Sequence, residues 1–188
     1  PNPSQLFLAE RTGKITGTAV FAGMEGTRPL FVEIQALISP SPLATPRRTV
    51  VGWDAGRLAM VLAVLEARCG LALTGQDVYL NIAGGLRVRE PAADLAVAAA
   101  LVSSFYNQAL PEDMVVFGEI GLGGEVRPVD QAEVRLKEAQ KLGFSRAVAP
   151  PIQRADTPAI EIEEIAHLSD LLAQFQSPPL RQIHAADA

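Results

Sequence analysis

The sequence predicts one α+β domain in which helices pack on mixed sheets. β-Branched and apolar runs lie between glycines and prolines, which is typical of strands. Two longer segments repeat apolar residues at intervals of three and four, which is typical of amphipathic helices, and a third helical segment ends at a glycine. Because some strands are joined by short turns and others are separated by helices, the order does not fit a strictly alternating parallel sheet.

Each element is justified by its own local pattern. A strand is expected where an alternating run ends at glycine or proline, and a helix where the apolar spacing lengthens between a capping residue and a glycine. In chain order we expect strands at residues 15–22, 30–38 and 48–52, a helix between Asp54 and Gly70, a strand at 78–82 that continues through 86–89, a helix at 91–106, strands at 115–119 and 125–129, a helix at 131–142, strands at 146–149 and 160–165, and a short helix at 169–175. The strands at 15–22 and 30–38 are expected to pair antiparallel, and those at 115–119 and 125–129 to form a hairpin.

The length of 188 residues fits a single domain, which we place at residues 1–176. A disordered tail is expected at 177–188, because Pro178, Pro179 and the small polar residues that follow offer no core. No apolar run approaches the roughly 20 residues that span a bilayer, so we expect a cytoplasmic protein without membrane association. The chain begins at Pro1 without a methionine, and we expect it to be part of a longer protein.

The composition limits the classes of function. A net charge of −5 excludes a generally basic surface, so any nucleic-acid contact must be a local patch. The single cysteine, Cys69, excludes an internal disulfide, and with only His167 and His184 beside it no convincing zinc site is expected. Cys69 ends an apolar helical pattern, which favours a buried, inert thiol.

Five arginines favour contact with nucleic acid. Arg47 and Arg48 follow a proline-rich loop, and Arg57 lies in the first turn of the next helix. Arg87 and Arg89 alternate with apolar residues, so both are expected on one strand face. Guanidinium groups bind phosphates in a bidentate manner, so the five arginines predict a patch that binds the DNA backbone without reading sequence.

Two further observations qualify this patch. Arg87 or Arg89 could instead pair with Glu90, with Asp94 or with a neighbouring subunit, and so hold an assembly together. Aromatic residues make up only 5% of the chain, too few for a platform on which single-stranded bases stack, so duplex DNA is favoured. The glycines at 84–85 and 121–124 fit no phosphate-binding motif and are interpreted as turns, so no cofactor is expected in this chain.

Several stretches in register resemble one known family. The longest are GGLRVREPAADLA at residues 84–96 and FGEIGLGGEVRPV at 117–129, supported by PNPSQLFL at 1–8 and VGWD at 51–54. Together they are similar to the C-terminal Lon-protease-like domain of the RadA (Sms) family of bacterial DNA repair proteins, over about residues 1–176. The resemblance implies a Lon-protease-like fold of the ribosomal protein S5 domain 2-like type.

The resemblance also implies a function. RadA-like proteins combine an N-terminal zinc-binding segment, a RecA-like ATPase core and this domain, so ATP, Mg and Zn are expected in N-terminal domains absent from this chain. They form homohexameric rings that use ATP to promote branch migration in homologous recombination, together with recombinases of the RecA type. This domain is then expected to provide ring assembly and sequence-independent DNA binding.

The same resemblance argues against peptidase activity. Lon peptidases use a serine nucleophile and a lysine base, and the matching positions here are Ala92 and Glu133. A methyl group cannot attack a carbonyl, and a carboxylate cannot complete the pair. Ser103 and Ser104 lie about 15 Å further along the helix by helical rise. A Lon-like peptidase with a displaced dyad and a pure oligomerisation scaffold remain the alternatives.

Overall fold

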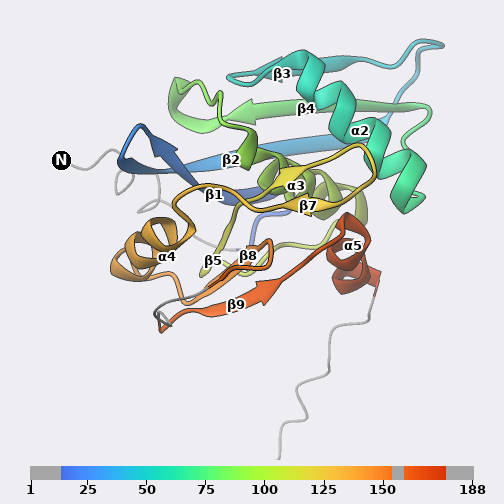
Figure 1. Cartoon of the computed structure of the whole chain (residues 1–188). Helices are drawn as coiled ribbons and strands as arrows, with labels where there is room; N and C mark the ends of the chain where they lie inside the picture. Colours follow the sequence, from blue (N-terminus) through green and yellow to red (C-terminus); the bar gives the residue numbers. More distant parts are fainter. Residues whose placement is uncertain (1–13, 154–158, 177–188) are drawn as a thin grey trace, which may run out of the picture.

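The computed structural model describes residues 14–153 and 159–176 (Figure 1). The predicted tail at 177–188 lies outside the described residues, and the single-domain prediction for 1–176 therefore stays a prediction. No helix in the described ranges is long and apolar enough to cross a membrane.

A seven-stranded mixed sheet forms the centre of the fold, with the strand order β3-β4-β2-β1-β5-β8-β9. β2 runs antiparallel to β1 and β4, and every other neighbouring pair in this sheet is parallel. All its strands except β2 therefore run in one direction. The strands are β1 (Thr18–Glu25), β2 (Arg28–Pro40), β3 (Arg48–Val51), β4 (Gln76–Ile82), β5 (Met114–Val116), β8 (Arg146–Ala149) and β9 (Glu161–Glu164).

A small second sheet and the helices complete the described fold. The second sheet is an antiparallel pair, and it lies against the turn that precedes α3 (Figure 1). The remaining elements are β6 (Glu119–Ile120), β7 (Val126–Arg127), α2 (Ala55–Cys69), α3 (Asp94–Tyr106), α4 (Ala132–Lys141), α5 (Leu168–Gln176) and two 3₁₀ turns, η1 (Ala83–Gly85) and η2 (Pro91–Ala93). The α+β class predicted from the sequence is confirmed.

The core is built around α3. Every residue from Asp94 to Ser103 is buried, because the helix packs across β1 and β2 and is contacted by α2 and α5. Alanines at 96 and 98–100 give the helix a slim surface that allows this close approach. Residues 95–102 of this helix are all apolar, which agrees with burial on every side.

The carboxylate of Asp94 is buried at the start of this helix. Asp94, 1% exposed, accepts hydrogen bonds from the Nε of Arg57 at 2.6 Å and from its Nη2. The backbone N–H of Ile120 donates to the same carboxylate at 3.0 Å. Asp94 thus joins the first turns of α2 and α3 to the small sheet, and its charge is compensated within the protein.

The helices agree closely with the sequence-based expectations. Asp54 caps α2 as predicted, and its side chain accepts from the backbone N–H of Arg57 at 2.7 Å. α4 and α5 lie within one residue at each end of the predicted ranges. These elements depend on local caps and spacing, which the sequence displays directly.

The predicted strand continuation at 86–89 is wrong. β4 ends at Ile82, and the chain turns at Gly84 and Gly85, whose φ values of 73° and 68° favour glycine. Residues 86–90 then run outside the sheet without regular structure. Arg87 and Arg89 nevertheless remain exposed on either side of the buried Val88.

Several strand boundaries also differ from the prediction. The hairpin predicted for 115–119 and 125–129 is wrong in part, because Val115 and Val116 belong to β5 in the central sheet and only residues 119–120 and 126–127 form the pair. β1 begins at Thr18 rather than at residue 15, because the Thr18 hydroxyl donates to the carbonyl of Ile15 and closes a turn there.

We expect Asp94→Ala to lower the free energy of unfolding by about 3 kcal/mol, since it leaves the Arg57 guanidinium without its buried carboxylate partner. Urea denaturation measures this loss. The matched control is Glu119→Ala, because Glu119 lies 3.9 Å from Arg57 on the exposed side. That change should cost about 0.5 kcal/mol or less. Equal losses for the two variants would show that the buried Asp94 carboxylate contributes no more to stability than the exposed Glu119.

Candidate functional site

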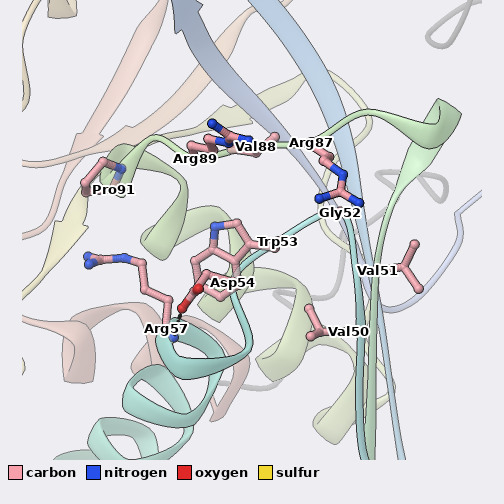
Figure 2. A pocket seen from close by; sticks show the side chains of 10 residues that line it. All are labelled: Val50, Val51, Gly52, Trp53, Asp54, Arg57, Arg87, Val88, Arg89 and Pro91. Carbon is pink, nitrogen blue, oxygen red and sulfur yellow. Dashed lines mark hydrogen bonds between the residues drawn. The ribbon is translucent and has the colours of Figure 1, made fainter.

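An open cavity of about 700 Å³ lies where β3 ends, α2 begins and residues 86–91 pass over both. Figure 2 shows Arg57 on one side of Trp53, and Arg87 and Arg89 on the segment opposite. The cavity therefore brings three of the five predicted arginines together. Its lining residues are Val50, Val51, Gly52, Trp53, Asp54, Arg57, Arg87, Val88, Arg89 and Pro91.

The arginine-bearing segment is anchored through its backbone. The N–H of Val88 donates to the carbonyl of Gly52 at 2.9 Å, and the Val88 side chain is 8% exposed. A Cβ at Gly52 would lie 2.5 Å from the carbonyl oxygen of Leu86, so only glycine permits this approach. Because Val88 is held inward, Arg87 and Arg89 point outward on both sides of it.

A buried network holds the far end of the segment. The Oε2 of Glu90 accepts from the backbone N–H of Met24 at 2.9 Å, and its Oε1 pairs with Arg135. Arg135, 2% exposed, also donates to the carbonyl of Ala22 at 2.8 Å and lies 5.6 Å from the ring centre of Phe117. Glu90 is thus paired with Arg135 and not with an arginine of the cavity.

The three cavity arginines differ in their charge balance. The hydrogen bonds to Asp94 raise the pKa of Arg57, and the same pair neutralises most of its field. Within the described part of the chain, no ion pair forms at Arg87 or Arg89, and both side chains are exposed. Most of the positive potential of the cavity therefore comes from these two residues.

Arg47 and Arg48 lie at the opposite end of β3 and do not line this cavity. The backbone N–H of Arg47 donates to Asp77 at 2.7 Å, and the Nη1 of Arg48 donates to the carbonyls of Arg47 and Gln76. Arg48 lines a different hollow, of about 250 Å³, between β3 and α2. The five predicted arginines thus form two separate groups.

The positions that match the Lon dyad both lie in the described fold. Ala92 is 3% exposed in η2, and its carbonyl accepts from the N–H of Gly118 at 2.8 Å. Glu133 lies in the first turn of α4, with an oxygen 4.0 Å from the Nζ of Lys137. A methyl group and a carboxylate occupy the two positions.

The serines further along α3 have structural partners. The buried Ser103 hydroxyl accepts from the N–H of Gly17 at 2.8 Å and donates to the carbonyl of Gln108 at 2.6 Å. The Ser104 hydroxyl accepts from the N–H of Ile38 at 2.9 Å. Both hydroxyls stabilise the junction between α3 and the sheet.

Sequence reasoning missed Trp53 and Arg135. Trp53 is 8% exposed and forms the floor of the cavity, and it is the only tryptophan in the chain. Its place directly before the helix cap Asp54 was the available signal. Arg135 lies within a charged helix, where the sequence pattern suggests a solvent-exposed side chain, and nothing in that pattern indicated its burial.

Comparison with known proteins places this geometry in a class. Residues 57–153, about half of the chain, match the model of the ChlI family, described as subunit ChlI of Mg-chelatase. The matched range contains the buried pair of Arg57 and Asp94 and the cavity segment with Arg87 and Arg89, so this part of the chain is of the ChlI class.

Close relatives identify the particular family. The DNA repair protein RadA of Brucella abortus (strain 2308) is 67% identical over 149 residues, which cover 79% of this chain and 32% of the relative. RadA of Rickettsia bellii (strain RML369-C) is 55% identical over 170 residues, or 90% of this chain and 38% of the relative. RadA of Synechocystis sp. (strain ATCC 27184 / PCC 6803 / Kazusa) is 57% identical over 149 residues, or 79% and 30%. The chain belongs to the RadA family of DNA repair proteins, as its motifs indicated.

The chain spans about a third of the length of these relatives.

The carboxylate of Asp77 accepts a hydrogen bond from the backbone N–H of Arg47, and we expect it to make the stability of the fold depend on pH. The hydrogen bond from the Arg47 N–H, with one from Ser41, lowers the pKa of Asp77 below its ordinary 3.8. A depressed folded-state pKa stabilises the fold above the unfolded pKa, and this contribution disappears as the pH falls through the folded pKa. Asp77→Asn keeps an acceptor oxygen but removes the charge.

Urea denaturation as a function of pH should therefore show Asp77→Asn less stable than the wild type above pH 3.8. The two stabilities should converge as the pH falls below that value. A stability difference that stays constant down to the lowest pH at which the protein folds would contradict the role of the Asp77 charge.

Proposed function

We propose that this chain is a non-catalytic assembly and DNA-contacting domain of a RecA-like DNA-repair ATPase. The observation that supports it best is the cavity in which Arg87 and Arg89 present exposed guanidinium groups on a chain of net charge −5. Positive charge concentrated on an acidic protein is what a local phosphate contact requires. The curated relatives are named DNA repair proteins, which agrees with this proposal.

The three arginines have different roles in this proposal. Arg87 and Arg89 bind phosphate oxygens, because neither is paired with a carboxylate of the described chain. Arg57 is held by Asp94, so it shapes the cavity and adds a smaller share of the attraction. Contacts of this kind position the backbone without reading the bases, so the binding is independent of sequence.

Duplex DNA is the proposed ligand. Trp53 is the one aromatic side chain that lines the cavity, and it is 8% exposed, so a row of stacked single-stranded bases has no platform there. An exposed pair of arginines suits phosphates at the surface of a duplex.

We infer the rest of the protein from its membership of the RadA family. In the full-length molecule, a zinc-binding segment and a RecA-like ATPase core with ATP and Mg precede this Lon-protease-like domain. Six copies form a ring in the cytoplasm that promotes branch migration during homologous recombination, beside a recombinase of the RecA type. This domain provides ring assembly and DNA affinity.

Peptidase activity is not part of the proposal. Ala92 has no nucleophilic atom, and Glu133 cannot act as the neutral amine that a serine–lysine pair needs. The serines of α3 are hydrogen-bonded to backbone groups, which argues against a displaced nucleophile.

The direct test is binding of this chain to a short fluorescent duplex, followed by anisotropy at several salt concentrations. We expect Arg87→Ala/Arg89→Ala to weaken binding at least about tenfold at low salt. The slope of log K against log salt should become shallower by about 0.9 for each phosphate that the variant no longer binds.

The matched control is Arg127→Ala/Arg146→Ala. It removes the same charge from exposed arginines that are paired with Glu125 and Asp113. The control should bind nearly as the wild type does. Equal weakening by the two double variants would mean that net charge, not the cavity, controls affinity. If the wild type assembles but does not bind the duplex at low salt, only the scaffold function would remain.

A further inference from the structure

The two edges of the central sheet carry opposite charge. β3 and β9 lie at opposite ends of the strand order, along the top and bottom of the fold in Figure 1. Exposed arginines lie at the β3 edge and exposed glutamates at the β9 edge. The residues are Arg47 and Arg48 on one edge, and Glu161, Glu163 and Glu164 on the other.

Both edges present backbone groups to a neighbour. Among the described residues, β3 pairs with β4 alone and β9 with β8 alone. The carbonyl of Arg47 accepts from Val78 on the β4 side, and the N–H of Glu161 donates to Ser145 on the β8 side. Because these groups alternate along a strand, the next residues, Arg48 and Ile162, direct theirs outward.

We propose that the β3 edge of one copy of this chain contacts the β9 edge of the next. Two β3 edges would bring arginines against arginines, and two β9 edges would bring glutamates against glutamates, so both symmetric pairings are repulsive. Only the unlike edges attract. Such a contact is head-to-tail, and repeated contacts of this type generate a closed ring when the rotation permits. This inference rests on the ring assembly in the proposed function and names its interface.

The direction of the strands permits this contact. β3 and β9 run in the same direction, because β2 alone opposes the rest of the sheet. Rotation about an axis along the strands therefore brings β9 of one copy beside β3 of the next in parallel orientation. The hollow of about 250 Å³ beside β3, lined by Val50, Ala59 and Ala63, adds apolar surface next to Arg48.

The acidic edge favours a positive neighbour. Partial burial, and then the nearby charge of Glu161, raise the pKa of Glu163, so its ionised form is disfavoured in the single copy. A guanidinium from the next copy would offset this repulsion. Arg47 and Arg48, which do not line the DNA cavity, thereby acquire a role of their own.

Charge exchange tests the contact. Sedimentation velocity of the 188-residue chain at low salt compares the wild type with Arg47→Glu/Arg48→Glu, with Glu161→Lys/Glu163→Lys/Glu164→Lys, and with all five changes combined. We expect each set alone to weaken association at least about tenfold, and the combined variant to recover it, because the attraction is restored with reversed signs. High salt should weaken the wild-type assembly.

Folding is followed separately by circular dichroism. The neutral variant Glu161→Gln/Glu163→Gln/Glu164→Gln removes the attraction without introducing repulsion, and it should also dissociate the assembly. It therefore tests the contact even where a charge-reversed variant does not fold. A wild type that is monomeric at low salt, a neutral variant that still assembles, or a folded combined variant that does not recover would each overturn the inference.

DNA binding of the same proteins separates this inference from the proposed function. If charge exchange does not restore assembly while Arg87→Ala/Arg89→Ala still loses DNA affinity, the proposed interface is wrong. The proposed DNA contact through the cavity of Arg87 and Arg89 is then retained. If Arg47→Ala/Arg48→Ala weakens DNA binding without changing assembly, the β3 edge is a DNA contact, and the inference is overturned.

Discussion

The site depends on the ion pair between the buried carboxylate of Asp94 and the guanidinium of Arg57. It receives the Arg57 guanidinium and the Ile120 N–H at the point where α2, α3 and the small sheet meet. A charge at this depth is stable only with its partners in place, so the arrangement of the three elements is restricted. The cavity opens directly beside this junction, because Arg57 lines it and Pro91 begins the turn that leads to Asp94.

Much of the fold could be predicted because its signals are local. The helix that begins after Asp54 and the helix at residues 132–141 are determined by caps and spacing, and both were placed closely. The partners of short strands depend on contacts distant in sequence. Val115 and Val116 pair with β1 and β8, which no local pattern indicates, so the predicted hairpin was wrong in part.

The residue types of the candidate site could be predicted, but their grouping could not. Arginines suited to phosphate are visible in the sequence, yet the separation of Arg87 and Arg89 from Arg47 and Arg48 depends on the turn after β4. The anchoring of Glu90 by Arg135 joins residues 45 positions apart. An acidic chain can thus present a basic cavity, because the nearby carboxylates of Asp94 and Glu90 are paired with Arg57 and Arg135.

The most direct measurement is the fluorescence of Trp53 during titration with a short duplex. As the only tryptophan, lying between Arg57 and the segment of Arg87 and Arg89, it reports on this cavity alone (Figure 2). We expect a saturable change in Trp53 emission, with a midpoint that matches the Kd for the duplex and rises with salt concentration. DNA binding that leaves the Trp53 emission unchanged would place the nucleic acid elsewhere on the chain and contradict DNA contact through this cavity.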